Sequence, residues 1–142
     1  MSIPTAVESS SLGQTVYITY CSKEKRTDSG LLQAADRYLS ERITRISQLA
    51  EQDNAHFIIL SGSYGFLLPS DKIPFYDHLL VDSEVADIAN LVNSQIAKYP
   101  IKPTTIHYFQ VPDDPYVGPY RRVVELACGF NNISLVINST SE

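Results

Sequence analysis

A cysteine, a serine and two lysines follow directly on a run of β-forming residues near the start of the chain. In the stretch VYITYCSKEK, the residues Cys21, Ser22, Lys23 and Lys25 come where the apolar run ends. A thiolate is a strong nucleophile, and positive charge near a cysteine favours that form. Lys23 is equally suited to hold a phosphate or a carboxylate as a point charge. Two plainer interpretations stay open: Cys21 as a small buried residue, and the lysines as part of a solvated loop.

Two further polar segments follow predicted strands. Residues 61–65, with the sequence SGSYG, come after HFIIL, and Asp113 and Asp114 come after TTIHYFQV. The first segment is either a ligand-binding loop or only a tight turn, since glycine permits positive φ. No Walker A, G-x-G-x-x-G or G-x-S-x-G pattern occurs, which disfavours dinucleotide binding and a serine nucleophile. Asp77 and His78 are either an acid–base pair or a solvated turn.

The elements that position these residues alternate between strand and helix. Runs rich in β-branched and aromatic residues predict strands at 15–21, 56–62, 104–111 and 134–139. Apolar residues at three- and four-residue spacing predict helices over 32–50, 83–99 and 119–129, the first capped by Asp28 or Ser29, the second by Ser83, and the third ended by Gly129. This order predicts an α/β protein, a three-layer sandwich with a mostly parallel sheet of about four strands and helices on both faces. The carboxyl ends of parallel strands share one edge, where such proteins usually bind ligands.

Residues 61–81 have no hydrophobic period and contain several glycines and prolines. A loop of this length within a domain is usually functional. We expect residues 63–81 to be ordered, because apolar side chains anchor them: Phe66, Leu67, Leu68, Ile73, Phe75 and Leu79. The predicted core consists of Val16, Ile18, Leu39, Ile58, Ile59, Leu60, Ile106, Tyr108 and Val136.

Length and composition are those of an ordinary globular protein, with 142 residues, 44% hydrophobic and 19% charged. We expect a flexible N-terminal tail over residues 1–14 and a single α/β domain over 15–142. The net charge of −5 argues against a general nucleic-acid coat, which needs an excess of Lys and Arg. A small basic cleft remains compatible with this charge, and the residues that would supply it are Lys23, Lys25, Arg26, Arg121 and Arg122.

The two cysteines, Cys21 and Cys128, fit a reducing compartment and cannot build a disulfide framework. The three histidines are scattered without ligand spacing, so we expect neither a metal nor a cofactor. No apolar run is long enough to span a membrane, and the first residues lack the pattern of a secretory signal. These features predict a cytoplasmic protein without a membrane partner, and they leave its oligomeric state open.

Three stretches together resemble a known group of domains. CSKEK, DRYLSERI and ILSGSYGFLLPSDKIPFYDHLL, between Val16 and Leu80, resemble a small uncharacterised family of bacterial, archaeal and phage domains. The typical motifs of that family are C-S-K-x-K, L-Y-x-S and L-S-A-x-Y-G-L-L-x-P. That family is distantly similar to the YaaA proteins, which are DNA-binding proteins of the peroxide-stress response. It is also distantly similar to DpdC, from the pathway that introduces 7-deazaguanine into DNA. A related cysteine-serine-lysine motif occurs in the archaeosine synthase domain, which acts on a nitrile-bearing 7-deazaguanine.

The resemblance implies a set of functional residues. The catalytic candidates are Cys21, Lys23 and Asp77, with the thiolate of Cys21 attacking an electron-poor carbon such as a nitrile and Asp77 accepting hydrogen bonds from a guanine-like edge. Tyr64 and Tyr76 are candidates to stack on a base. The substrate-binding candidates that match the family motifs are Ser22, Lys25, Tyr38, Ser40, Ser61, Tyr64, Gly65 and Tyr76. The full set also contains five residues that these motifs do not carry over, namely Gly62, Ser63, His78, Tyr120 and Arg121.

Three functions compete. The leading hypothesis is an enzyme directed at a nucleobase or nucleotide, one that modifies a 7-deazaguanine-type base in nucleic acid. The alternative is a non-catalytic module of a YaaA-like stress or DNA-modification system that binds nucleic acid or a nucleotide in the same crevice. The third is a subunit of a larger modification complex, whose acidic surface meets a basic partner.

Overall fold

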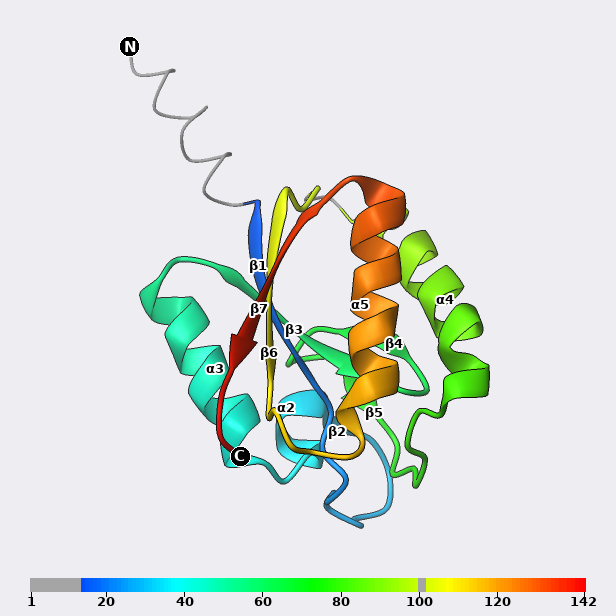
Figure 1. Cartoon of the computed structure of the whole chain (residues 1–142). Coiled ribbons are helices and arrows are strands. Elements are labelled where there is room, and N and C mark those ends of the chain that lie inside the picture. The colour runs from blue at the N-terminus through cyan, green and yellow to red at the C-terminus, as the bar shows by residue number, and fades with distance from the viewer. Residues whose placement is uncertain (1–13, 100–101) are drawn as a thin grey trace.

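The chain folds into three layers, with a five-stranded sheet between helices (Figure 1). The computed structural model describes residues 14–99 and 102–142, so most of the tail predicted over 1–14 lies outside the described residues. The sheet has the order β4-β3-β1-β6-β7. Its strands are β1 (Thr15–Tyr20), β3 (His56–Ser61), β4 (Gly65–Leu67), β6 (Thr105–Gln110) and β7 (Ser134–Ser139). Helix α3 (Glu41–Gln52) covers one face, and α4 (Val85–Lys98) and α5 (Val117–Asn131) cover the other. The α/β class is therefore confirmed.

The sheet is mixed, which corrects the prediction of a mostly parallel sheet of about four strands. β3, β1, β6 and β7 pair in parallel, and the fifth strand, β4, pairs antiparallel with β3. Residues 62–64 form the turn, and Gly65 opens β4 with a φ of +69°. A strand of three residues is too short to give a periodic signal, and the segment that contains it is predicted as a loop for that reason.

The first predicted helix is in fact two helices, which corrects the prediction of one helix over 32–50. A two-residue strand, β2 (Leu32–Gln33), leads into a single turn, α2 (Ala34–Arg37), and α3 begins four residues later. The side chain of Ser40 accepts a hydrogen bond from the backbone N–H of Ile43, so Ser40 is the N-cap of α3. The backbone at Tyr38 is extended, and Leu39, expected in the core, is 52% exposed as a result.

Residues 63–81 contain two short strands and are tied to the rest of the fold. β5 (Lys72–Ile73) pairs antiparallel with β2. The fully buried guanidinium of Arg37 donates to the carbonyls of Arg26 (2.9 Å), Asp28 (2.9 Å), Gly30 (2.8 Å) and Ile73 (3.2 Å). Of the six expected anchors, three are buried, Leu79 is partly buried, and two are exposed: Phe66, Leu67 and Ile73 are inside, while Leu68 and Phe75 are outside.

Three smaller predictions are also corrected. A short 3-10 helix, η1 (Asp82–Glu84), precedes α4, so Ser83 is not its cap. Helix α5 runs past Gly129 and ends at Asn132, which has a left-handed φ of +57°. Val136, expected in the core, is 40% exposed, because it lies on the edge strand β7 while α3 packs on β1 and β3. The other seven residues predicted for the core are buried: Val16, Ile18, Ile58, Ile59, Leu60, Ile106 and Tyr108.

None of the described helices is both long and apolar enough to cross a membrane. Within residues 14–99 and 102–142, no group of three or more potential ligands from His, Cys, Asp and Glu could hold a metal ion.

Candidate functional site

Cys21 lies at the carboxyl end of the central strand. Its backbone N–H donates to the carbonyl of Leu60 (2.9 Å), which extends the pairing of β1 with β3 by one residue. The residue is only 2% exposed. Beyond it the chain leaves the sheet through Ser22, whose hydroxyl donates to the carbonyl of Glu24 (2.5 Å) and fixes the turn. Cys21 and Ser22 therefore lie at the carboxyl edge of the parallel strands, where α/β proteins usually bind ligands.

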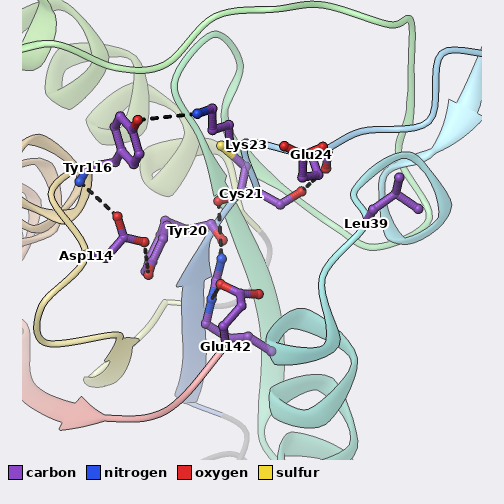
Figure 2. A pocket seen from close by; sticks show the side chains of 10 residues that line it. Tyr20, Cys21, Lys23, Glu24, Leu39, Asp114, Tyr116 and Glu142 are labelled. Carbon is purple, nitrogen blue, oxygen red and sulfur yellow. Dashed lines mark hydrogen bonds and ion pairs between the residues drawn. The ribbon is translucent and has the colours of Figure 1, made fainter.

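A cavity of about 260 Å³ opens beside this strand end (Figure 2). We call it the Cys21 cavity. It is lined by residues that follow β1 and β6 and by residues from the segments around Leu39 and Glu142. The lining residues are Tyr20, Cys21, Ser22, Lys23, Glu24, Leu39, Arg42, Asp114, Tyr116 and Glu142.

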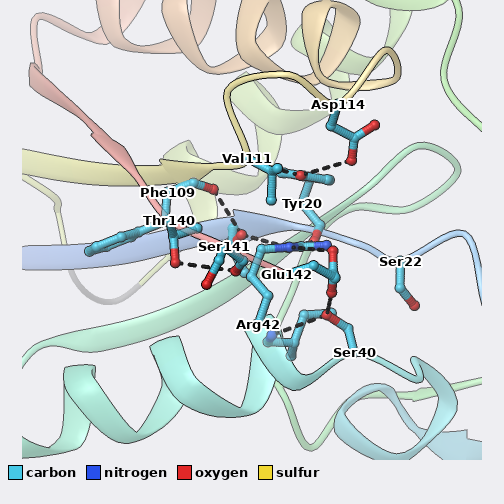
Figure 3. Close-up of polar contacts among 12 residues, drawn as sticks. Tyr20, Ser22, Ser40, Arg42, Phe109, Val111, Asp114, Thr140, Ser141 and Glu142 are labelled. Carbon is cyan, nitrogen blue, oxygen red and sulfur yellow. Dashed lines mark hydrogen bonds and ion pairs between the residues drawn. The ribbon is translucent and has the colours of Figure 1, made fainter.

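Arg42, from the first turn of α3, forms the floor of the Cys21 cavity. Its side chain is about 1% exposed, and its guanidinium donates to the hydroxyl of Thr19 (2.6 Å) and the carbonyl of Tyr20 (2.7 Å). The guanidinium carbon lies 3.8 Å from the centre of the Tyr20 ring. Its Nε donates to the carboxylate of Glu142 (3.2 Å), which also accepts from Ser40 (Figure 3). A cation buried to this degree needs such partners, because desolvation is costly.

The opposite wall of the Cys21 cavity carries an aromatic ring and a lysine that contacts it. Asp114 accepts from the backbone N–H of Tyr116 (2.9 Å) and from the hydroxyl of Tyr20 (3.1 Å). Lys23 Nζ lies 3.4 Å from the hydroxyl of Tyr116 and 5.3 Å from the centre of its ring. Burial, only partly offset by the charge of Arg42, raises the pKa of Tyr20 to about 12. Tyr20 therefore stays a neutral hydrogen-bond donor at physiological pH.

Five further predicted residues form a second group, which we call the tyrosine cluster: Tyr38, Ser61, Tyr64, Tyr76 and Lys25. The hydroxyl of Tyr76 lies 2.9 Å from that of Ser61 and 2.5 Å from that of Tyr38. The Tyr64 and Tyr76 rings meet edge to face, with centres 5.3 Å apart. Lys25, 8% exposed, places Nζ 4.7 Å from the centre of the Tyr76 ring and 5.8 Å from that of Tyr38. These side chains therefore pack on one another.

Tyr120, from α5, contacts Cys21 directly. Its hydroxyl lies 3.5 Å from the sulfur and accepts a hydrogen bond from the backbone N–H of Leu80 (3.1 Å). Gly62 packs against the Tyr120 hydroxyl, and any larger residue would crowd it: a Cβ at this position would lie 3.0 Å from the Tyr120 hydroxyl and 3.1 Å from the Leu80 nitrogen. Glycine at position 62 thus allows the phenol to reach the sulfur.

Burial is the main reason why the phenols around Cys21 stay neutral. It raises the pKa of Tyr38, Tyr76 and Tyr120 well above the usual value, and negative charge on Cys21 raises it further for all three. Burial likewise raises the pKa of the other thiol, Cys128, to about 11, which makes it unreactive.

The remaining predicted residues lie apart from the Cys21 cavity. Asp77 is exposed and does not line the cavity. His78 pairs with Glu84 (2.9 Å), and Arg121 pairs with Glu125 (3.1 Å) one turn along α5. Ser63 and Gly65 serve the turn between β3 and β4, and Ser40 caps α3.

Seven lining residues of the Cys21 cavity were not among the predicted site residues: Tyr20, Glu24, Leu39, Arg42, Asp114, Tyr116 and Glu142. Asp114 could have been predicted from the sequence, since it follows the third predicted strand, at the ligand-binding edge of the sheet. Arg42 could not, because its position in a helix reads as solvent-exposed until Thr19 and the backbone carbonyls below it are known. Comparison of the chain with protein-family models, with curated proteins and with solved structures finds no match.

Proposed function

We propose that the protein is an enzyme that acts on a nucleobase or nucleotide of the 7-deazaguanine type, with Cys21 as its nucleophile. The observation that carries the proposal is the Cys21 cavity, in which a cysteine, a lysine, a buried arginine and an aromatic ring share one small space. The C-S-K-x-K motif, through its resemblance to domains of 7-deazaguanine modification, supports the same choice of substrate.

The size and lining of the Cys21 cavity suit a single flat base. Its volume of about 260 Å³ lies just below the range of roughly 300–1,000 Å³ found for drug-sized ligands. The ring of Tyr116, 40% exposed, is available to stack on a base. Carboxylates of Glu24 and Asp114 line the cavity and accept hydrogen bonds, as the donor edge of a guanine-like base requires. They replace Asp77 in the role that the resemblance gives to it.

The chemistry follows from a thiol beside a neutral phenol. When Cys21 adds to a nitrile, a sulfur–carbon bond forms, one carbon–nitrogen π bond breaks, and the thiol proton passes to nitrogen. The product is a neutral thioimidate that contains every atom of both reactants. The hydroxyl of Tyr120, 3.5 Å from the sulfur, is placed to carry that proton. Lys23 attracts an anionic group of the substrate at the mouth of the cavity.

The test uses intact-mass spectrometry of the protein incubated with a nitrile-bearing 7-deazaguanine base. We expect a mass increase equal to the whole base, located at Cys21 by peptide mapping. Cys21→Ser should lose the adduct and keep most of the binding, while Cys128→Ser, the matched control, should keep both. If no adduct forms on Cys21 although the base binds, the nucleophile role is wrong.

A second candidate function has one observation in its favour: Cys21 is only 2% exposed, as befits a packed residue. On this alternative the protein is a non-catalytic module that binds a nucleotide or nucleic acid with the Cys21 cavity. It predicts that Cys21→Ser lowers stability by about 1–3 kcal/mol without a specific loss of function. Thermal melts beside titrations with a panel of nucleotides separate the two candidates.

A further inference from the structure

The two edges of the five-stranded sheet are built differently. β4, at one edge, is three residues long, and the side chain of Gln95 bonds to both the N–H (2.7 Å) and the C=O (3.2 Å) of Phe66. β7, at the other edge, pairs with β6 in one continuous register from Ser134 to Ser139. It contains no proline, no bulge and no charged residue, which are the devices that keep an edge strand from pairing with another chain. The β4 edge is therefore closed to a further strand, and the β7 edge is open to one.

Alternate backbone groups of β7 point away from the sheet. The N–H of Thr140 donates to the carbonyl of Gln110, next to β7 on β6 (2.9 Å), and the groups that face β6 recur at every second residue from there. The N–H and C=O groups of Leu135, Ile137 and Ser139 therefore point outward. Within residues 14–99 and 102–142, no other segment forms a hydrogen bond with them. The partner that satisfies such a row of groups is another strand.

The sequence of β7 is complementary to itself. On either side of Val136, the apolar residues Leu135 and Ile137 come first, and the polar residues Ser134 and Asn138 follow. An antiparallel pairing of two copies about Val136 sets Leu135 against Ile137 and Ser134 against Asn138, on both sides of a twofold axis. Such a match of apolar with apolar and of polar with polar residues fixes the register of paired strands.

The distribution of charge points to the same partner. When a strand pairs with its own copy, a charge near the twofold axis lies close to an identical charge, which is unfavourable. Residues 126–141 contain no charged residue, although 19% of the chain is charged and the net charge is −5. This segment is therefore a surface on which two acidic copies can meet without local repulsion.

The helix that packs beside β7 adds exposed apolar surface. α5 packs against both α4 and β7 (Figure 1). Leu126 and Phe130, one turn apart on α5, are 52% and 76% exposed, and Val136 on β7 itself is 40% exposed. A stable interface buries about 800 Å² on each partner, so a dimer needs apolar area beyond that of the paired strands. These side chains provide such area.

We propose that a second copy of the chain binds to the β7 edge, with the two β7 strands antiparallel about a twofold axis at Val136. The two five-stranded sheets then form one continuous sheet. The proposal concerns the surface made by β7 and α5, and it does not depend on the reaction proposed for Cys21.

A cysteine crosslink tests the register. Residues of β7 whose backbone groups face β6 become non-hydrogen-bonded pairs in the dimer, with Cα atoms about 4.5 Å apart, a distance that a disulfide spans. We expect Val136→Cys to form an intermolecular disulfide under mild oxidation, seen as a dimer band on a non-reducing gel. Asn138→Cys is the matched control on the same face of β7, because its copy would lie about 13 Å away along the strands, and it should stay uncrosslinked. The native Cys21 and Cys128 are both buried, so the parent protein should not crosslink either.

A double variant checks the same register from the other pair. Ser134→Cys alone should stay uncrosslinked for the same reason as Asn138→Cys. Combined in one chain, the two cysteines lie opposite each other across the axis, and the double variant should form the intermolecular disulfide that neither single variant forms.

Sedimentation velocity measures the association of the parent protein without an added cysteine. We expect a species with twice the 15.8 kDa of one chain. Val136→Lys should weaken the association about a hundred-fold, because it sets two ammonium groups against each other at the axis. Leu68→Lys is the matched control, since Leu68 is 43% exposed on the segment after β4, at the opposite edge of the sheet, and it should leave the association unchanged.

A parent protein that stays monomeric at the highest concentration measured would overturn the proposal. So would crosslinks that form equally with Val136→Cys and Asn138→Cys, or a dimer that Val136→Lys does not weaken. Should Val136→Lys fail to fold, as judged by its thermal melt, the crosslinks decide alone. A dimer with the expected crosslinks but no adduct on Cys21 would remove the proposed reaction and leave the interface in place.

Discussion

Two glycines that both have a positive φ offer a sharp test of how the antiparallel strand β4 is held. Gly65 has a φ of +69° and Gly30 a φ of +82°, a region that costs an L-residue roughly 1–2 kcal/mol. A Cβ at Gly30 would meet nothing within 4 Å, whereas one at Gly65 would lie 2.5 Å from Gln95 Oε1. The substitution to alanine therefore adds the same strain at both positions and a collision at only one.

The collision matters because Gln95 holds both edges of the turn. Its Oε1 accepts from the backbone N–H of Phe66 (2.7 Å), and its Nε2 donates to the carbonyls of Tyr64 (3.1 Å) and Phe66 (3.2 Å). Displacing the side chain leaves the amide of Phe66 unpaired, which costs about 1–3 kcal/mol. Alanine also restricts the unfolded chain, which offsets about 0.4–1 kcal/mol at both positions. We expect Gly30→Ala to cost about 0–1.5 kcal/mol and Gly65→Ala about 1–4.5 kcal/mol.

Urea denaturation followed by circular dichroism measures both values under one set of conditions. Gln95→Ala completes the comparison, because in that background only the Leu91 side chain, 3.2 Å from the new Cβ, remains close, and Gly65→Ala should cost little more than Gly30→Ala. Equal costs for the two glycine variants in the parent protein would refute the argument, since they would show that Gln95 does not hold β4.

Three further predictions follow from single contacts. Although burial acts in the opposite direction, the hydrogen bond from Ser40 and the charge of Arg42 hold the pKa of Glu142 below its usual value. The stability that ionised Glu142 contributes is present above the ordinary glutamate pKa of about 4.3 and is lost as the pH falls through the lower pKa of the folded state. Glu142→Gln should therefore make the melting temperature less dependent on pH from about pH 5 downward. Arg37→Lys should lower the free energy of unfolding by more than about 3 kcal/mol, because an ammonium group lacks the rigid fork of donors with which the guanidinium binds four carbonyls. The control Arg45→Lys, at an exposed position, should change it by less than about 0.5 kcal/mol. Gly129→Ala should raise stability by about 0.5–1 kcal/mol in urea denaturation, because the site is inside α5 and nothing lies within 4 Å of the new Cβ; a loss of stability there would contradict the helix assignment.

The parallel part of the fold could be predicted because its signals are local. β3 contains a continuous apolar run, β1 and β6 are rich in β-branched and aromatic residues, and α4 has a clear apolar stripe. The break between α2 and α3 could not be predicted in the same way. The apolar spacing continues across it, and Ser40 becomes a cap only because Tyr38 is held in an extended conformation beside Lys25. That bridge depends on a loop distant from the helix pattern.

The position of the Cys21 cavity followed from topology, but most of its polar residues did not. Arg37 and Arg42 lie within a helical pattern, where charged residues are expected to face solvent. They are buried because backbone carbonyls at the ends of other segments accept their protons. A periodic pattern records which side chains are apolar, and it contains no information on where unpaired carbonyls will lie. Buried arginines of this kind become visible only when the fold is known.

The hydrophobic pattern is equally uninformative about the polar contacts of the buried tyrosines. In a hydrophobic pattern Tyr108 and Tyr120 count as core residues, and both are buried as such a pattern predicts. What the pattern does not show is which groups their hydroxyls meet, such as the Leu80 amide and the Cys21 thiol, which both donate to the Tyr120 oxygen. Because burial raises their pKa values, these phenols remain donors across the physiological range. The contact between Tyr120 and Cys21 joins residues that are 99 positions apart in the chain, so no local pattern in the sequence could have shown it.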